Sequence, residues 1–215
     1  MNKPLRVSAR ALVGFSLFPP DIMPVSGRLM AEGRLGHQAR QAESKAKAEA
    51  VLRWAGECCG TAVEVQGRMD LYDDTANPPL IEEIKLTGDT PPEEAFQEHL
   101  AQAAVYGFML CEKEGLPSVA LRVSYVTAAG EERAAFYEEM ARDELRARFF
   151  ELLIPYVRWQ ARLWALREAR DASITALPFP YPDFRPGQKE MAAQAYTAIA
   201  RRKRLFAVMP TGTGK

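Results

Sequence analysis

Cysteine, histidine and long apolar runs are all scarce in this sequence. The three cysteines, Cys58, Cys59 and Cys111, form no CxxC pair, which argues against a cysteine metal site, and their odd number argues against a disulfide framework. We therefore expect reduced, buried thiols and a cytoplasmic location. No stretch approaches the ~20 apolar residues of a membrane span. The short apolar run Ala11–Phe18 ends at two prolines without a cleavage site, so we do not interpret it as a signal peptide.

An excess of charge of either sign is also missing. The chain of 215 residues has 28 Lys and Arg against 28 Asp and Glu. A nucleic-acid contact would therefore have to come from a local patch rather than from a global basic field. The 47% hydrophobic content is ordinary for a globular protein. The length is sufficient for one core with an appendage, or for two small domains.

The stretch Glu64–Leu86 carries the most informative pattern. Apolar and polar residues alternate in its first half, which predicts a half-buried strand. The residues expected on the apolar side are Val63, Val65, Met69 and Leu71. Those expected on the polar side are Glu64, Gln66, Arg68 and Asp70. A turn over residues 73–79 precedes a second predicted strand, 80–86, in which Glu83 and Lys85 point the same way.

If these two strands pair as a hairpin, Asp70 comes beside Glu83 and Lys85. Two close carboxylates repel each other unless a cation lies between them, and oxygen ligands suit Mg²⁺ or Mn²⁺. The lysine would then be free to contact a phosphate or to orient a water. The alternative is that these acids form the solvated face of an antiparallel strand, because so short a pattern is common.

One helix is predicted before this hairpin and one after it. The composition of residues 28–54 is helical, and His37 lies early in that segment. A single histidine at a helix start is more often an ordinary surface or core residue than a ligand. In the predicted helix Glu93–Lys113, a stripe more polar than a packed core face is expected. Its members are His99, Gln102 and Tyr106.

The remaining part of the chain predicts more sheet and a long helix. Strands are expected over Ser118–Thr127 and Glu131–Tyr137, extending the central sheet. The helix predicted over Glu138–Arg170 mixes arginines with Trp159 and Trp164, so it could bind phosphates and stack bases. The alternative is a solvated helix with i,i+4 ion pairs, because acidic residues dilute the arginines.

The C-terminal residues predict a second, incomplete unit. Prolines in Asp171–Pro182 indicate a linker. A helix over Arg185–Arg204 and a short buried-type strand over Leu205–Met209 are expected next. The chain then stops at the sequence PTGTGK, which is typical of the first half of a phosphate-binding loop. The expected domains are residues 1–170, a linker over 171–184, and 185–215.

Taken in order, several short motifs resemble those of RecB-like nucleases of the PD-(D/E)XK superfamily. They are GxxxH over Gly33–His37, GRMD ending in Asp70, EIK over Glu83–Lys85, and HLAQAAVY with Gln102 and Tyr106. The resemblance implies an α/β fold over residues 1–170, with a restriction-endonuclease-like mixed central sheet flanked by helices. It also implies cleavage of DNA, with single-stranded DNA favoured. No iron–sulfur cluster is expected, because the cysteine pattern of that branch is missing.

The same resemblance implies a role for each motif residue. The implied ligands of Mg²⁺ or Mn²⁺ are His37, Asp70, Glu83 and the backbone carbonyl of Ile84. Lys85 would orient the attacking water or stabilise the transition state. Gln102 and Tyr106 would contact DNA or support the metal ligands. Two alternatives stay open, a non-cleaving DNA-binding module and a structural platform for an ATP-dependent helicase.

The tail resembles the start of an XPD/DinG-like superfamily 2 helicase. That resemblance implies that Gln188 reads adenine and that Gly212, Gly214 and Lys215 bind phosphates. Met209 departs from it, because a small residue usually opens the phosphate loop. The part of the loop after Lys215 is absent, so we expect ATP to act only in a full-length protein with a C-terminal helicase domain.

Overall fold

The computed structural model describes residues 3–17, 35–42, 44–178 and 181–208. The chain divides into two compact units, Met1–Trp164 and Ala165–Lys215. Gly33, Met209, Gly212, Gly214 and Lys215 lie outside the described residues, so the expectations for them stay predictions. None of the described helices has the length and apolar character needed to cross a membrane.

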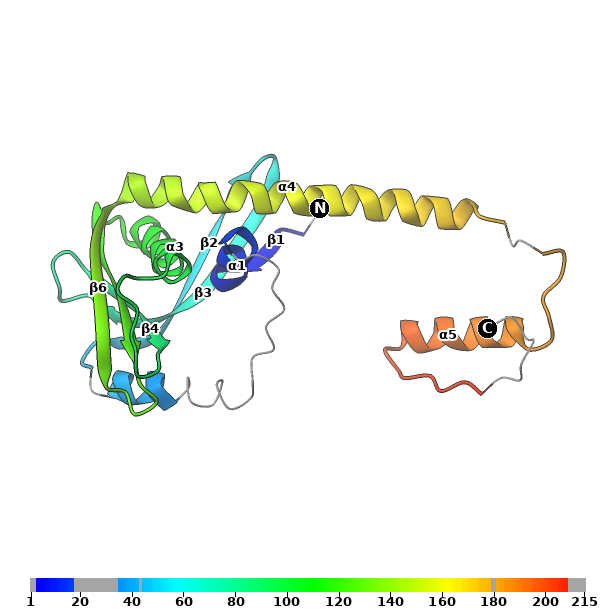
Figure 1. The fold of residues 1–215 in the computed structure, drawn as a ribbon. Helices are drawn as coiled ribbons and strands as arrows, with labels where there is room; N and C mark the ends of the chain where they lie inside the picture. The colour runs from blue at the N-terminus through cyan, green and yellow to red at the C-terminus, as the bar shows by residue number, and fades with distance from the viewer. Residues whose placement is uncertain (1–2, 18–34, 43, 179–180, 209–215) are drawn as a thin grey trace. The chain divides into compact units, whose positions relative to one another are not determined.

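A mixed sheet, six-stranded in the described residues, forms the centre of the N-terminal unit (Figure 1). Its order is β1-β3-β4-β5-β6, with β2 paired to β3 outside this path. The strands are β1 (Leu5–Ser8), β2 (Lys47–Cys58), β3 (Thr61–Asp73), β4 (Leu80–Leu86), β5 (Ser118–Val126) and β6 (Glu132–Ala141). The predicted α/β class with a mixed sheet is confirmed.

Strand β3 is the branching point of the sheet. It pairs antiparallel with β2 along one edge. The other edge is shared, because β1 pairs in parallel with residues 63–66 and β4 pairs antiparallel with residues 71–73. Residues 67–70 lie between these two ladders and pair with neither β1 nor β4. The predicted hairpin is therefore confirmed, and it opens into a fork at Asp70.

Helices cover both faces of this sheet. The described helices are α1 (Ala9–Leu17), α3 (Gln97–Glu114), α4 (Arg142–Ala176) and α5 (Gln188–Ala200), and residues 35–42 are also helical. Buried residues of α1, α3 and α4 share one core with Ile81 of β4. Ile84 belongs instead to a small separate cluster on the other face of β4. The helical residues 35–42 approach that face, where a Cβ on Gly36 would lie 2.7 Å from the Thr127 carbonyl oxygen.

One predicted helix boundary and one predicted side-chain face are wrong in the first half of the chain. Residues 47–54 belong to strand β2 and not to a helix. Their Ala, Glu and Lys content favours a helix locally, but pairing with β3 along almost the whole strand overrides that preference. Leu71 was expected on the same side as Met69, yet Met69 lies in the main core and Leu71 in the small cluster. The alternation breaks at Asp70, beside Glu49, which has a positive φ of 59°.

The second half of the chain also departs from prediction. Strand β6 extends to Ala141, and helix α4 then continues through Pro155 to Ala176, into the predicted linker. Residues 205–208 form no strand, and Phe206 is 93% exposed. A short apolar run alone does not distinguish a buried strand from an exposed segment.

The cysteines are free thiols. Cys58 and Cys111 are buried as predicted, but Cys59 is exposed. Cys59 has a positive φ of 51° in the tight connection between β2 and β3, and such a turn lies at the surface. The prediction of three buried thiols is therefore wrong for Cys59.

Gly67 allows helix α3 to pack closely against the fork of β3. A Cβ at this position would overlap Cε1 of Tyr106 and approach the Tyr106 Oη and the Ala9 Cβ to 3.1 Å each. We expect Gly67→Ala to lower the free energy of unfolding by roughly 1–3 kcal/mol, because Tyr106 must move. Urea unfolding measures this effect.

Gly88→Ala is the matched control, because a Cβ there would meet nothing within 4 Å. It should change the free energy of unfolding by no more than about 0.5 kcal/mol. Equal effects of the two substitutions would contradict the close packing of Tyr106 on Gly67.

Candidate active site

The fork between β3 and β4 is closed by a side chain. Asp70 Oδ2 accepts a hydrogen bond of 2.8 Å from the backbone N–H of Ile84. Strand β4 leaves the β3 ladder after Glu82, and a buried amide without a partner would be costly. The Asp70 carboxylate therefore replaces the missing backbone acceptor. Continuing the register by one pair would place Asp70 opposite Glu83, which explains why the two carboxylates are neighbours.

Glu83 is a buried acid whose two carboxylate oxygens have different surroundings. Its side chain is 2% exposed. Oε1 accepts a bond of 2.6 Å from the Lys85 ammonium, whereas Oε2 is buried without a hydrogen-bond partner among the described residues. Burial raises the pKa of Glu83 to about 7, and the charge of Asp70 adds to this effect, while Lys85 opposes it. An orphaned carboxylate oxygen beside a second carboxylate suits a hard divalent cation.

His37 reaches this point from the opposite layer. Its Nδ1 lies 3.5 Å from Asp70 Oδ1. The hydrogen bond to Asp70 raises the pKa of His37, although burial opposes the shift. From the same helical segment, the Gln41 side-chain amide donates to the Asp70 backbone carbonyl at 3.1 Å. Helical residues 35–42 are thus attached to β3 at Asp70 itself.

The polar stripe of α3 faces the same fork. Lys85 Nζ donates to Gln102 Oε1, and Gln102 Nε2 donates to Tyr106 Oη, both at 3.4 Å. Burial raises the pKa of Tyr106 to about 12, so the phenol stays protonated. His99 belongs to the stripe but contacts Tyr125 Oη at 2.8 Å instead. The stripe is therefore a partly buried polar structure.

The predicted residues thus converge from three segments and the α3 helix. Their contacts form two separate series. One joins His37, Asp70 and Ile84, and the other joins Glu83, Lys85, Gln102 and Tyr106. Within the described ranges, however, no group of three His, Cys, Asp or Glu side chains has an arrangement that could hold a metal ion. Contacts with Lys85 and His37 involve one oxygen of each acid. The donor types fit Mg²⁺ or Mn²⁺, and binding would require these contacts to rearrange.

A second buried polar cluster lies on the other face of β4 and was missed from the sequence. Glu82 Oε1 accepts from Arg40 at 3.0 Å and from Ser124 at 2.6 Å. Arg122 lies 3.6 Å from the other Glu82 oxygen, and Glu132 contacts both arginines. The cluster fastens the helical segment that carries His37 to strands β4 and β5. The only sequence signal was a second acid, Glu82, directly before Glu83.

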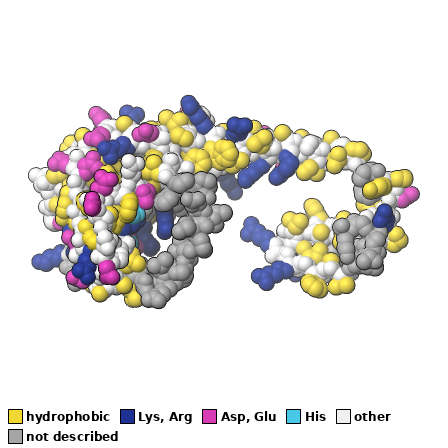
Figure 2. All heavy atoms as spheres, in the orientation of Figure 1, with side chains coloured by type: hydrophobic (Ala, Val, Ile, Leu, Met, Phe, Trp, Pro, Cys, Tyr) yellow, Lys and Arg dark blue, Asp and Glu magenta, His cyan; other side chains and the backbone are white. Residues whose placement is uncertain are grey.

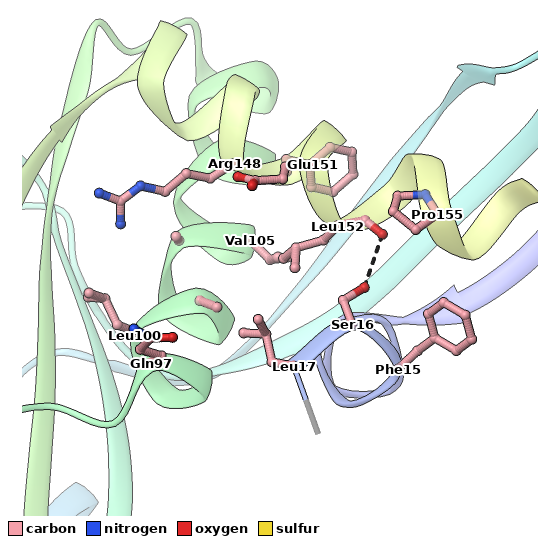
Figure 3. A pocket seen from close by; sticks show the side chains of 13 residues that line it. Phe15, Ser16, Leu17, Gln97, Leu100, Val105, Arg148, Glu151, Leu152 and Pro155 are labelled. Carbon is pink, nitrogen blue, oxygen red and sulfur yellow. Dashed lines mark hydrogen bonds between the residues drawn. The ribbon is translucent and has the colours of Figure 1, made fainter. Parts of the chain in front are cut away.

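A larger cavity lies elsewhere in the N-terminal unit. It has a volume of about 680 Å³ between α1, α3 and α4. Figure 3 shows Leu17, Leu100 and Val105 around it, with the hydrogen bond from Ser16 to the Leu152 carbonyl. Its lining is largely apolar and includes none of the candidate site residues. The cavity is therefore separate from the candidate site.

Charges on the surface do not mark the site either. Figure 2 shows Lys and Arg interspersed with Asp and Glu over the visible face of the N-terminal unit.

In the C-terminal unit, Gln188 begins helix α5, and its Oε1 accepts from the Arg185 N–H at 2.9 Å. The predicted adenine-reading amide is therefore engaged locally at the helix start.

Comparison with known proteins now gives this arrangement a family. The family model of the PD-(D/E)XK nuclease superfamily matches residues 18–184, and the chain belongs to that superfamily. Among the solved structures similar to it is one titled "Crystal structure of SSO0001". That structure is 13% identical, with a TM-score of 0.48 over 71% of this chain and 75% of the other. No curated protein matches the chain.

The buried charge of Glu83 should cost stability. The unfolded carboxyl ionises near its ordinary value of 4.5 and the folded one near a pKa of about 7. The unfolded chain therefore releases its proton first, and stability falls as the pH rises through this interval. The glutamine of the variant Glu83→Gln cannot ionise. In EDTA, the free energy of unfolding of Glu83→Gln should therefore exceed that of the wild type by an amount that grows over this pH interval and then levels off, on the order of 1–3 kcal/mol. Urea unfolding at a series of pH values measures it.

Glu57→Gln removes the same charge from an exposed position in β2. This control should change the free energy of unfolding by no more than about 0.5 kcal/mol. If Glu83→Gln were less stable than the wild type above the folded pKa, the contact with Lys85 would outweigh the burial of the charge.

Proposed function

We propose that this chain carries a divalent-metal-dependent deoxyribonuclease domain, with single-stranded DNA as the preferred substrate. The observation that supports this most strongly is the pair of neighbouring carboxylates, Asp70 and Glu83, with an orphaned oxygen on Glu83 and the Lys85 ammonium in contact. Membership of the PD-(D/E)XK nuclease superfamily supports the same reaction class.

The groups that would hold Mg²⁺ or Mn²⁺ are Asp70, Glu83, His37 and the backbone carbonyl of Ile84. Oxygen donors with one imidazole suit either ion. When bound, the metal lowers the pKa of a coordinated water and neutralises charge that develops on the scissile phosphate.

Lys85 and its neighbours supply the rest of the site. The Lys85 ammonium is only partly exposed, and a positive charge in such a place stabilises charge that develops on a phosphate oxygen. Gln102 accepts from Lys85 and donates to Tyr106, so it fixes where the ammonium lies. Tyr106 is fixed in turn by its close packing on Gly67.

The preference for a single strand rests on the tail. Residues 185–215 resemble the start of a superfamily 2 helicase, and a helicase domain in a longer protein would supply unpaired DNA. In that protein, Gln188, Gly212, Gly214 and Lys215 would bind ATP. The helicase context is part of the proposal and stands on sequence resemblance alone.

A non-cleaving DNA-binding module is the second candidate. The observation that favours it is the direct contact of Lys85 with Glu83, together with the lack of a three-residue metal arrangement in the described part of the chain. Such a module would bind DNA without a metal and would not cut it in Mn²⁺.

Cleavage of end-labelled single- and double-stranded DNA in Mg²⁺ or Mn²⁺ tests the proposal. Lys85→Ala and Asp70→Asn should each lower the rate by roughly 100-fold or more, because they remove the ammonium and a metal-binding charge. Asparagine keeps an oxygen that can accept from the Ile84 amide, so the sheet fork should survive. Circular dichroism checks that both variants remain folded.

Lys113→Ala is the control, because it removes a lysine from an exposed position near the end of α3. It should cleave at the wild-type rate. Cleavage that persists in both Lys85→Ala and Asp70→Asn would contradict the assigned roles. A folded wild type that binds DNA but never cuts it would establish the second candidate.

A further inference from the structure

A small polar cavity adjoins the candidate active site and is not used by the roles assigned above. Its volume is about 90 Å³, and it is lined by Arg10, Val13, Lys85, Glu98, His99 and Gln102. A cavity needs about 10–15 Å³ of such volume to admit one water, so this cavity has room for a larger polar group. Lys85 and Gln102 belong to both the cavity and the catalytic cluster, so a group bound here would lie next to the reacting phosphate.

Arg10 supplies a cation to this cavity. It lies in the first turn of α1 and is exposed. It forms no ion pair with any acid that the structure describes. Arg6, four residues earlier, is by contrast bound to Glu64 at 2.7 Å. The cavity is thus lined by two cations, Arg10 and Lys85, and one acid, Glu98, while the Lys85 ammonium also contacts Glu83.

His99 supplies a hydrogen-bond donor through a chain of contacts. The Phe96 backbone N–H donates to Tyr125 Oη at 3.0 Å, and Tyr125 Oη lies 2.8 Å from His99 Nδ1. The buried Tyr125 hydroxyl proton has no other acceptor among the described residues, so it is donated to Nδ1. The ring proton is then on Nε2. Burial and the charge of Lys85 lower the pKa of His99 to about 4, which keeps the ring neutral.

We propose that Arg10, His99, Gln102 and Lys85 form a pocket for a DNA backbone phosphate next to the one that is cleaved. The inference rests on the proposed nuclease function and adds Arg10 and His99 to its substrate contacts. Guanidinium, ammonium, imidazole N–H and amide N–H groups are the donors that bind phosphate oxygens in proteins. The pocket would fix the position of the strand relative to Asp70 and Glu83.

Binding of an end-labelled oligothymidylate in EDTA, followed by fluorescence anisotropy over a series of salt concentrations, tests this pocket. Arg10→Gln should weaken binding about tenfold, because it removes a charge-assisted hydrogen bond. It should also reduce the slope of log K against log salt by about 0.7, which is the value for one phosphate contact on a single strand. Arg10→Lys keeps the charge and should keep the slope.

Two further variants separate contact from structure. His99→Phe removes the Nε2–H donor without changing charge, so it should weaken binding a few-fold and leave the salt slope unchanged. Arg53→Gln removes an exposed arginine from β2. Its neighbour Trp54 packs on α3 and α4, so Arg53 points to the other face of the sheet. This control should bind as the wild type does.

The failures of the two proposals give different results. If the wild type binds and cleaves DNA while Arg10→Gln and His99→Phe retain its affinity and salt slope, the phosphate pocket is overturned and the nuclease function stands. If Arg10→Gln and Arg53→Gln lose affinity and slope equally, the effect is general surface charge and the pocket is again overturned. If the folded wild type neither binds nor cleaves DNA, both proposals fail.

Discussion

The hydrogen bond from the Ile84 amide to the Asp70 carboxylate is the interaction on which the site depends. Strands β3 and β4 separate at this point, and a side chain takes the place of the next ladder acceptor. Asp70 and Glu83 occupy the next register position, and Glu83 contacts Lys85, which in turn contacts Gln102. Glu49 of β2 lies next to Asp70 of β3 and has a positive φ, so the backbone of β2 is irregular at the same point.

The two faces of strand β4 carry different polar clusters. Glu83 and Lys85 face α3, where the polar stripe meets them. Glu82 faces the other way and accepts from Arg40 and Ser124. That second cluster holds the helical segment from which His37 reaches Asp70. Adjacent glutamates in one strand therefore have different tasks, because successive side chains point to opposite faces. Glu82 has two arginine partners, whereas Glu83 has one lysine and an oxygen without a hydrogen-bond partner among the described residues.

Local patterns were sufficient for part of this structure. Alternation predicted β3 and β4, and the i, i+3 and i+4 spacing predicted that Gln102 and Tyr106 share a face. Residues 47–54 were mistaken for helix because their composition is helical, and only the partner strand β3 makes them extended. The face of Leu71 could not be predicted, since it depends on a backbone irregularity at Glu49 and Asp70. The Glu82 cluster needs Arg40, Arg122 and Ser124, whose proximity arises from tertiary pairing.

The central claim is that Asp70 and Glu83 form the core of a divalent-cation site. Calorimetric titration of Mn²⁺ into the wild type, Asp70→Asn and Glu83→Gln tests it most directly, because it needs no substrate and no turnover. The account predicts a single site per chain in the wild type, with loss of at least tenfold in affinity in each variant, since each removes one ligand charge. Equal binding by all three proteins, or no binding by the folded wild type, would contradict it.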